Sequence, residues 1–389
     1  MEKTIKDLDI YISDGNYSSK YPRSEEFVDD GIPFIRGNNM VDGDITDDEM
    51  YHITPEKHAV LLKGHVKAGD VLITTRGNIG QVAIVPDRHE DSNINAQIVL
   101  LRTNPESLYN RYLLWALQSQ RANEQYLALQ TGTALKQLPV GKLEKLSIKV
   151  ADINKQHEIA DVLDKTYGVI KARRNELKLL DELIKARFVE LFGDLRTNTK
   201  GWEIKTFDEL SYLITDGEHA TPRRSPEGIY LLSARNVLNH SLQLDDVDYI
   251  DQEEYDRIAK RVVPQEGDVL ISCSGTVGRC CSVPADFKFQ MVRSAALIRF
   301  KEEINPIFAE YMITSDYLQE QINSSKTASS QANLFQGKIK ALKGFVPPIE
   351  LQNEFLMFVK QVDKSKVAVQ KALNEAQLLF DSLMQIYFG

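Results

Sequence analysis

The sequence predicts an α/β (α+β) protein with two similar globular domains in tandem, separated by two long helices that pair as an antiparallel coiled coil. Three observations support this prediction. The 389-residue chain repeats itself at a period near 196 residues. Each copy contains two short apolar, β-branched runs joined by a glycine turn, and each copy ends in a proline-free stretch with a heptad pattern. A period of this length is too long for a solenoid and indicates whole domains.

Composition places the chain among globular proteins. Hydrophobic residues make up 42% and charged residues 26%, as in ordinary folded domains. No apolar run approaches the roughly 18–20 residues of a membrane span, and the first residues form no apolar signal core. We therefore expect a cytoplasmic protein without membrane contact. The three cysteines, Cys273, Cys280 and Cys281, are too few and too clustered for a disulfide framework.

The clearest repeated segment predicts a strand, a tight turn and a second strand. Residues 69–86 read GDVLITTRGNIGQVAIVP and residues 267–284 read GDVLISCSGTVGRCCSVP, with nine of 18 positions identical. In the first copy the strands are expected at 71–75 and 81–85, and Pro86 ends the second one. The glycines of the turn recur in both copies, which predicts a positive φ or a close approach at Gly77, Gly80, Gly275 and Gly278.

Helical patterns follow the strands in each copy. Residues 107–127 read as one amphipathic helix, and residues 306–323 as its copy. Residues 150–193 then align without a gap to residues 346–389. These patterns predict two globular domains, each followed by one long helix, with bounds at 1–150, 151–196, 197–346 and 347–389.

Each of the two final segments carries apolar residues every seventh position over about five heptads, which is typical of a coiled coil. At 1.5 Å per residue each helix would be roughly 60 Å long, about the length of 18 base pairs. The predicted seam consists of Ile159, Leu163, Ile170, Leu177, Leu180, Ile184, Leu191, Phe355, Val359, Val362, Val369, Leu373, Phe380 and Leu383.

On these residues the chain resembles the specificity (S) subunits of type I restriction–modification systems. The resemblance covers essentially the whole chain. It rests on the GDVLI runs at 69–73 and 267–271, the glycine turns after them, the Gly-Ile openings at Gly31 and Gly228, and the two heptad tails that end in Phe-Gly. No single motif is highly specific, but their repetition in one order is.

The resemblance implies two target recognition domains without catalytic activity. Each would read one half of an asymmetric, bipartite sequence in double-stranded DNA, across a non-specific spacer. The helical regions would gather two methyltransferase (M) subunits, which bind S-adenosylmethionine and methylate adenine N6. Restriction (R) subunits would add ATP- and Mg-dependent translocation and cleavage. No cofactor is expected on this chain itself.

Polar residues in loops are the candidates for reading DNA, because Arg and Lys recognise guanine, Asn and Gln recognise adenine, and Ser and Thr adapt to either. The corresponding loops differ between the two copies, as two different half-sites would require. The candidates are Ser18, Lys20, Arg23, Arg36, Asn38, Asn39, Thr74, Thr75, Arg76, Asn78, Thr133 and Lys136 in the first domain, and His219, Thr221, Arg223, Arg224, Arg235, Asn236, Ser272, Ser274, Thr276, Lys326, Gln331 and Asn333 in the second.

The net charge of −9 argues against a broadly basic DNA binder. If M subunits supply much of the phosphate clamp, the S subunit need not be basic, because sequence readout depends on a few base contacts. Two alternatives remain: a specificity or scaffold subunit of another methylation-based defence complex, and a protein-interaction scaffold that does not read DNA.

Enzyme signatures are missing from the sequence. There is no GxxxxGK[ST] and no HExxH, and nothing positions Cys273 as a nucleophile beside His219 or His240. His52, His58 and His65 show no ligand spacing that fits one helix face, so we interpret them as surface histidines. We expect neither catalytic residues nor a metal site.

Overall fold

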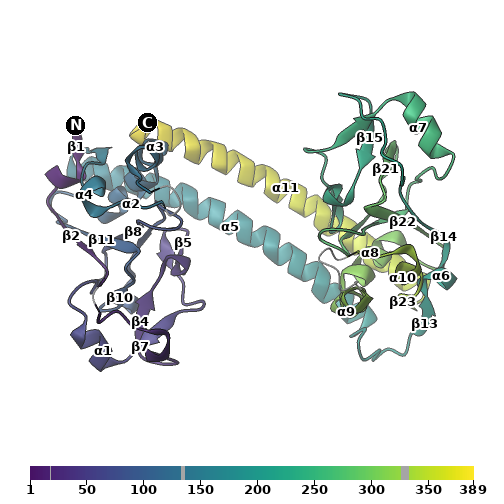
Figure 1. The fold of residues 1–389 in the computed structure, drawn as a ribbon, viewed down its shortest axis with the longest axis horizontal. Helices are drawn as coiled ribbons and strands as arrows, with labels where there is room; N and C mark the ends of the chain where they lie inside the picture. Colours follow the sequence, from purple (N-terminus) through teal and green to yellow (C-terminus); the bar gives the residue numbers. More distant parts are fainter. Residues whose placement is uncertain (18, 133–135, 326–332) are drawn as a thin grey trace. The chain divides into compact units, whose positions relative to one another are not determined.

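The computed structural model describes residues 1–17, 19–132, 136–325 and 333–389, and the chain divides into two compact units (Figure 1). Unit 1 comprises Met1–Arg174 and Gln370–Gly389, and unit 2 comprises Asn175–Val369. Each unit thus contains one globular domain and one part of each long helix. Within the described residues, no helix is long and apolar enough to cross a membrane.

A four-stranded antiparallel sheet with the order β2-β11-β8-β9 forms the centre of unit 1. Val71 and Ile73 of β8 pack in the cluster that contains α2, whereas Leu72 packs in a cluster on the other face. Burial on both faces explains why this strand is a continuous apolar run rather than an alternating one. A second sheet has the order β10-β4-β7-β3, with β10 parallel to β4. Two-stranded pairs complete the strands of the unit.

The strands of unit 1 are β1 (Glu2–Thr4), β2 (Ile10–Asp14), β3 (Phe27–Val28), β4 (Ile32–Ile35), β5 (Met40–Val41), β6 (Asp44–Ile45), β7 (Tyr51–Ile53), β8 (Val71–Thr74), β9 (Val82–Ile84), β10 (Asn93–Ile94), β11 (Ile98–Thr103) and β12 (Ser147–Lys149). Its helices before the long one are α1 (Pro55–Val60), α2 (Asn110–Gln118), α3 (Gln120–Leu129) and α4 (Val140–Leu143).

Unit 2 repeats this topology. Its central sheet has the order β14-β22-β19-β20, and its second sheet has the order β18-β15-β21 with β15 parallel to β21. The strands are β13 (Glu203–Thr206), β14 (Ser211–Asp216), β15 (Ile229–Leu232), β16 (Val237–Leu238), β17 (Ser241–Leu242), β18 (Asp248–Ile250), β19 (Val269–Ser272), β20 (Cys280–Ser282), β21 (Phe289–Met291), β22 (Ala295–Phe300) and β23 (Lys343–Val346). The short helices are α6 (Phe207–Leu210), α7 (Gln252–Ala259), α8 (Pro306–Thr314), α9 (Asp316–Ser325) and α10 (Gln336–Lys340).

The predicted strand–turn–strand segment is confirmed in both units, as β8–β9 and β19–β20. The predicted positive φ is also confirmed at all four turn glycines, with values of 72° and 90° in unit 1 and 68° and 92° in unit 2. At Gly80 a side chain is excluded as well, because a Cβ there would lie 2.8 Å from the Tyr126 ring.

The single helices predicted at 107–127 and 306–323 are wrong: each segment forms two helices. In unit 1 the break falls at Ser119, whose side chain accepts a hydrogen bond from Ala122 N at 3.2 Å and so caps α3. Ser315 occupies the corresponding position between α8 and α9. Serine favours such a start because its hydroxyl satisfies a free backbone N–H, and an apolar period alone does not reveal the change of direction.

The long helices are α5 (Ile153–Phe192) and α11 (Ile349–Phe388), and they run antiparallel beside each other within each unit (Figure 1). In unit 1 the ring centroids of Tyr167 and Phe380 lie 5.5 Å apart. In unit 2 Phe188 and Phe355 lie 5.4 Å apart. The predicted seam residues are all at least partly buried. Those exposed by 7% or less are Ile159, Leu163, Ile170, Ile184, Phe355, Val359, Val362 and Val369, and the half-buried ones are Leu177, Leu180, Leu191, Leu373, Phe380 and Leu383.

An ion pair with a buried carboxylate recurs beside the central strands of both units. Asp70, 1% exposed, accepts bonds from Arg102 Nε and Nη2 at 2.7 Å each and from Lys67 N at 2.8 Å. Asp268 forms the same pattern with Arg299 and with Gln265 N. Each carboxylate thus ties the loop before a central strand to the neighbouring strand.

We expect Asp70→Asn to lower the free energy of unfolding of unit 1 by about 2–4 kcal/mol, because the amide cannot accept both guanidinium bonds and leaves Arg102 uncompensated. Urea denaturation of the purified chain would measure the loss. Asp161→Asn is the control, since its pair with Lys165 is exposed and spans 3.8 Å, and such pairs contribute about 0–1 kcal/mol. Equal shifts in the two variants would contradict the expected role of Asp70.

Candidate nucleic-acid interface

The turns after β8 and β19 are built by buried hydroxyl groups. Thr74 Oγ1 donates to Asn78 O and accepts from Gln81 N at 3.0 Å. Ser272 Oγ donates to Thr276 O at 2.7 Å and accepts from Arg279 N at 3.0 Å. The two side chains therefore hold equivalent turns in shape, and both are buried.

Three further candidates are also directed into the fold. Asn39 and Asn236 are fully buried, and the amide group of each bonds to backbone atoms of its own loop. Thr75 is buried and donates to Gln97 O at 3.1 Å. Together with Thr74 and Ser272, these residues have almost no side-chain surface to offer to a base and are better explained as supports of the loops.

A pocket of about 350 Å³ opens in unit 1 between the end of β2, the turn after β8 and the residues before α4. Arg76 and Tyr17 stand at this pocket, with the guanidinium carbon 4.9 Å from the centre of the Tyr17 ring. Partial burial raises the pKa of Tyr17, so its hydroxyl stays protonated and can both donate and accept. Asp14 and Gln137 add polar groups to the lining.

Unit 2 has a pocket of about 480 Å³ at the equivalent place. Its lining includes Asp216, His219, Ser274, Arg293 and Asn333. His219 Nε2 lies 2.7 Å from Asp216 Oδ2, which fixes the ring at the rim. The candidates Ser274 and Asn333, which are half-buried, come together here because a backbone bridge joins them.

The backbone around the two pockets has the same hydrogen bonds, which allows the linings to be compared position by position. Thr75 N bonds to Gln97 O, and Leu138 N to Thr75 O; in unit 2 the same bonds join Cys273, Ser294 and Leu334. Each pocket has one arginine, but the two come from different segments: Arg76 follows β8, whereas Arg293 lies between β21 and β22. The equivalent pairs are Tyr17 and His219, Arg76 and Ser274, Ala96 and Arg293, and Gln137 and Asn333.

The arginines of the pockets differ in their partners from four other arginines that lie in or next to turns of the second sheets. Within the described residues, the structure shows no ion pair for Arg76 or Arg293. In contrast, Arg223 pairs with Asp251 and Glu253, Arg224 pairs with Asp248, and Arg235 pairs with Asp246 and Asp248. Arg36 lies 3.4 Å above the Tyr51 ring and donates to Glu49 O.

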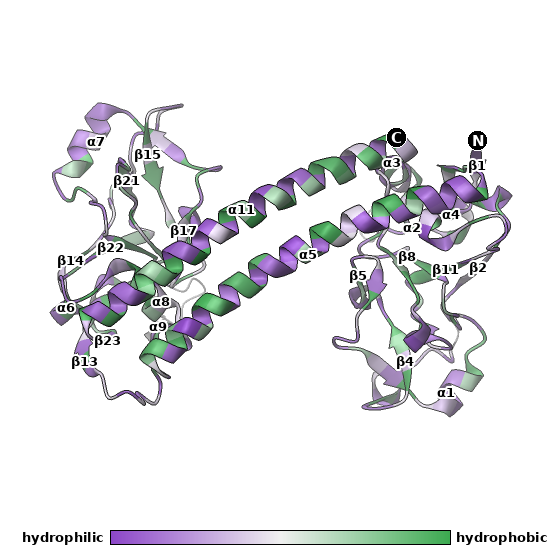
Figure 2. Cartoon of the chain, turned by 180° about the vertical axis from the view of Figure 1, so that it is seen from behind, coloured by the Kyte–Doolittle hydropathy of each residue, from purple (hydrophilic) through white to green (hydrophobic). Residues whose placement is uncertain are grey.

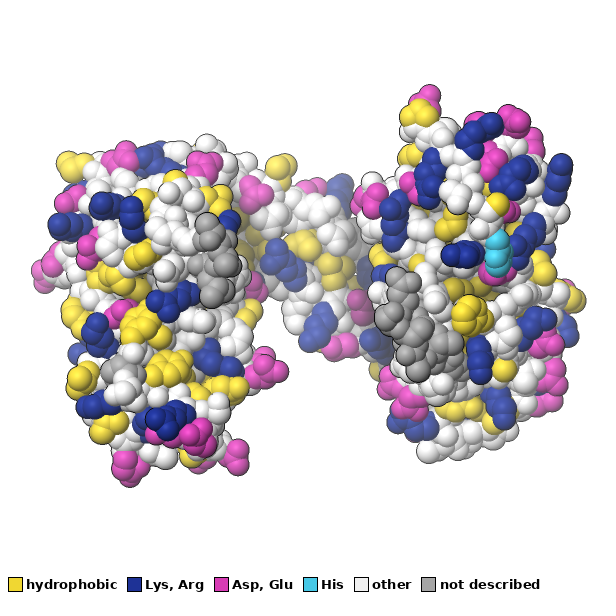
Figure 3. Space-filling view, viewed as in Figure 1, with side chains coloured by type: hydrophobic (Ala, Val, Ile, Leu, Met, Phe, Trp, Pro, Cys, Tyr) yellow, Lys and Arg dark blue, Asp and Glu magenta, His cyan; other side chains and the backbone are white. Residues whose placement is uncertain are grey.

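The remaining candidates are placed at the surface or lie outside the described residues. Lys20, Arg23, Asn38, Asn78, Lys136, Thr221 and Thr276 are exposed. Ser18, Thr133, Lys326 and Gln331 fall in the segments that the structure does not describe. On the face seen in Figure 3, basic and acidic side chains are interspersed over both units, so the described part of this face shows no continuous basic patch.

Of the two pocket arginines, Arg76 is among the candidates predicted from the sequence and Arg293 is not. Arg293 lies in the short segment between β21 and β22, which shows no turn motif and no cluster of polar residues. The signal that could have identified it is the difference between the copies, where a small residue, Ala96, faces a long cation.

The pocket of unit 2 contains a thiol, but its chemistry does not favour nucleophilic catalysis. Burial raises the pKa of Cys273 to about 12, so the thiolate that would act as a nucleophile is scarcely populated at neutral pH. The repeat partner of Cys273 is Thr75, which is likewise buried.

The chain is similar to known proteins over most of its length. The family described as type I restriction modification DNA specificity domain matches twice, over residues 4–179 and 200–377. The putative type I restriction enzyme MjaX specificity subunit of Methanocaldococcus jannaschii is 22% identical over 373 residues, covering 88% of this chain and 84% of the relative. The EcoBI specificity subunit of Escherichia coli is 25% identical over 191 residues, covering 47% of this chain and 39% of the relative.

Two solved structures share the fold. The S subunit of a type I restriction–modification system from M. genitalium has a TM-score of 0.61 at 15% identity, covering 100% of this chain and 96% of that one. A chain from a study of complex assembly and conformational transition in the type I system has a TM-score of 0.56 at 16% identity, covering 99% and 96%.

Proposed function

The chain belongs to the type I restriction modification DNA specificity family, as a non-catalytic specificity subunit, and from this we propose that each of its domains reads one half of a bipartite DNA target. The observation that carries the proposal is the pair of equivalent pockets with different linings. The backbone hydrogen bonds around the pockets are the same in both units, while the polar side chains that could recognise base edges differ.

The chemistry of the linings fits base recognition. Arginine bonds with guanine O6 and N7, and glutamine or asparagine bonds with adenine N6 and N7. Unit 1 offers Arg76 with Gln137, and unit 2 offers Arg293 with Asn333. Because the arginines stand on different walls, the same fold would present a guanine-reading group in two geometries. Two domains of this kind would read two different half-sites.

The long helices fit the role of a spacer that also binds M subunits. Hydrophobic residues recur along both helices (Figure 2), and several of them are exposed. Exposed apolar groups in such numbers are typical of surfaces that a partner covers. The exposed ones are Val162, Val169, Leu179, Leu183 and Val189 on α5, and Met357, Val367, Leu378, Leu379 and Ile386 on α11.

The acidic balance of the chain agrees with a shared grip on DNA. Phosphate contacts supply most of the sequence-independent affinity of a DNA-binding protein. With a net charge of −9, this chain would leave much of that work to the M subunits. R subunits would join through the same complex and provide ATP-dependent cleavage. A protein scaffold without DNA reading remains the alternative, in which the two domains would hold two protein partners.

A genome-wide map of N6-methyladenine in the source strain, with and without this gene, tests the proposal directly. We expect one bipartite motif to lose its methylation completely in the deletion strain, because the M subunits would have no other reader for it. Complementation with the intact gene should restore the motif. If methylation persists at every motif while the M subunits are expressed and active, DNA reading by this chain is contradicted and the scaffold alternative gains support.

A further inference from the structure

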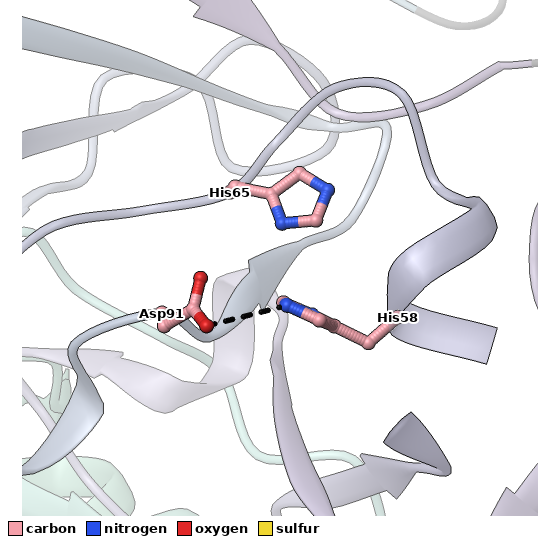
Figure 4. Close-up of side chains that lie close together, drawn as sticks. All are labelled: His58, His65 and Asp91. Atoms are coloured by element: carbon pink, nitrogen blue, oxygen red, sulfur yellow. Dashed lines mark ion pairs between the residues drawn. The ribbon is translucent and has the colours of Figure 1, made fainter. Parts of the chain in front are cut away.

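We propose that unit 1 contains a zinc-binding site formed by His58, His65 and Asp91. The three side chains come from separate segments: α1, the loop before β8 and the turn before β10. One ligand atom from each lies within 4.8 Å of the other two, and the side chains face one another (Figure 4). His58 Nε2 lies 3.5 Å from Asp91 Oδ2. His58 and His65, interpreted from the sequence as surface histidines, are half-buried, and their rings lie 4.4 Å apart.

The hydrogen bonds of the two rings prepare their remaining nitrogens to bind a metal. His65 Nε2 lies 2.7 Å from Leu61 O, and a carbonyl oxygen can only accept, so the proton of the neutral ring sits on Nε2. His58 Nδ1 lies 2.5 Å from Asn93 Oδ1, which assigns its proton in the same way. The lone pairs of His65 Nδ1 and His58 Nε2 are then free. Histidines that bind metals usually have this kind of oxygen acceptor behind the ring.

The geometry suits zinc with little rearrangement. Zinc binds imidazole nitrogen and carboxylate oxygen at about 2.0–2.2 Å, so neighbouring ligands in a tetrahedral site lie about 3.3 Å apart. The separation of 3.5 Å between His58 and Asp91 already meets this requirement, and a small rotation would bring His65 to it. Three protein ligands leave the fourth position for water. Asp91 has a φ of 60°, an uncommon conformation for a residue with a side chain.

The second domain provides an internal comparison, because its fold is the same and its ligands are absent. Equivalent positions follow from the strand pairing and from the guanidinium bonds of Arg102 to His65 O and of Arg299 to Val263 O. The positions of His58, His65 and Asp91 are occupied there by Tyr255, Val263 and Lys288. Lys288 Nζ lies 4.5 Å from the centre of the Tyr255 ring, so a cation–π contact stabilises this place in unit 2. The fold itself does not require the histidines.

A metal at this place would support the wall of the unit 1 pocket. Gly64, next to His65, packs so closely on Gly15 that a Cβ at position 64 would lie 3.1 Å from Gly15 Cα. Lys63 pairs with Asp14 of the pocket at 3.0 Å. Zinc would join α1 to this loop and to the turn before β10, and so restrain the segment that leads to Tyr17.

Zinc titration of the full chain, purified with its M subunits where needed and without a histidine tag, tests the proposal. After chelator treatment, competition with a chromogenic zinc indicator should show one zinc ion per chain, and cobalt should give the visible absorption of a tetrahedral site. His65→Ala and Asp91→Asn should lower the zinc affinity at least about tenfold, since each removes one of three ligands. His52→Ala is the matched control, because this histidine of β7 lies outside the cluster, and it should bind zinc as the wild type does.

The triple variant His58→Tyr, His65→Val and Asp91→Lys installs the residues of unit 2 and keeps the test independent of folding defects. It should fold, and added zinc should leave its melting temperature unchanged, whereas added zinc should raise the melting temperature of the wild type. Zinc bound equally by the wild type and the triple variant would overturn the proposal. So would a wild-type chain that binds no zinc at micromolar concentrations.

Discussion

Arg76→Ser is expected to weaken recognition of one half-site by about 5- to 150-fold and to leave the other half-site unaffected. The substitution places in unit 1 the residue that unit 2 has at the equivalent position, Ser274. It removes a guanidinium that no carboxylate neutralises in the described structure. A bidentate contact to a base contributes roughly 1–3 kcal/mol of discrimination, which gives the range stated. Arg293→Ala places in unit 2 the residue that unit 1 has at the equivalent position, Ala96. This substitution should weaken recognition of the other half-site alone.

Binding of the assembled complex to DNA duplexes with either half-site randomised would separate these effects. Arg223→Ser is the matched control, because Arg223 is also exposed but its charge is held by Asp251 and Glu253. We expect the control to change affinity less than about threefold. If Arg76→Ser instead weakened all sequences uniformly and reduced the salt dependence of binding, Arg76 would contact phosphate. Readout by this pocket would then be excluded.

The architecture could be predicted from the sequence because the two halves of the chain repeat each other and can be aligned. A strand and a turn such as those of residues 69–86 are ambiguous alone, but the copy at 267–284 shows which glycines the fold requires. The heptads of α5 and α11 were equally readable, since a heptad period sustained along 40 residues is characteristic of a long helix that packs along one face. The breaks at Ser119 and Ser315 were missed because both halves of each helix pair keep an apolar face.

The candidate site could be predicted only in part, because a polar residue in a turn can face either way. Thr74 and Asn39 are of the residue types that read bases, yet their side chains form hydrogen bonds with backbone atoms of the loops. Arg293 belongs to no sequence motif, and it became a candidate only because the structure places it in the same pocket as Ser274. The same limitation applied to His58 and His65, which are brought together with Asp91 by tertiary packing and not by spacing along one helix.

Deleting one heptad from each long helix, residues 171–177 of α5 and 370–376 of α11, should abolish binding to the natural target while leaving the sequence of each half-site unchanged. Seven residues shorten a helix by about 10.5 Å, or about three base pairs. The deletion nearly preserves the helix face, because seven residues fall about 20° short of two full turns. Three base pairs, however, turn the DNA by about 100° at 10.5 pairs per turn. The two half-sites would then no longer meet their domains together, and affinity should fall at least about 10³-fold, to the non-specific level.

Selection from a pool of duplexes with all spacer lengths would show what the shortened chain still recognises. We expect either no bipartite target or the same half-sites with a shorter spacer. The double substitution Lys178→Ala and Glu182→Ala is the control at full length, since it removes an exposed ion pair of 3.8 Å on α5 and should alter neither spacer nor affinity. A shortened chain that selected new half-sites at the old spacing would contradict the role of the helices as a spacer. The reason is that the helices, in this proposal, determine only the distance between two domains that read independently.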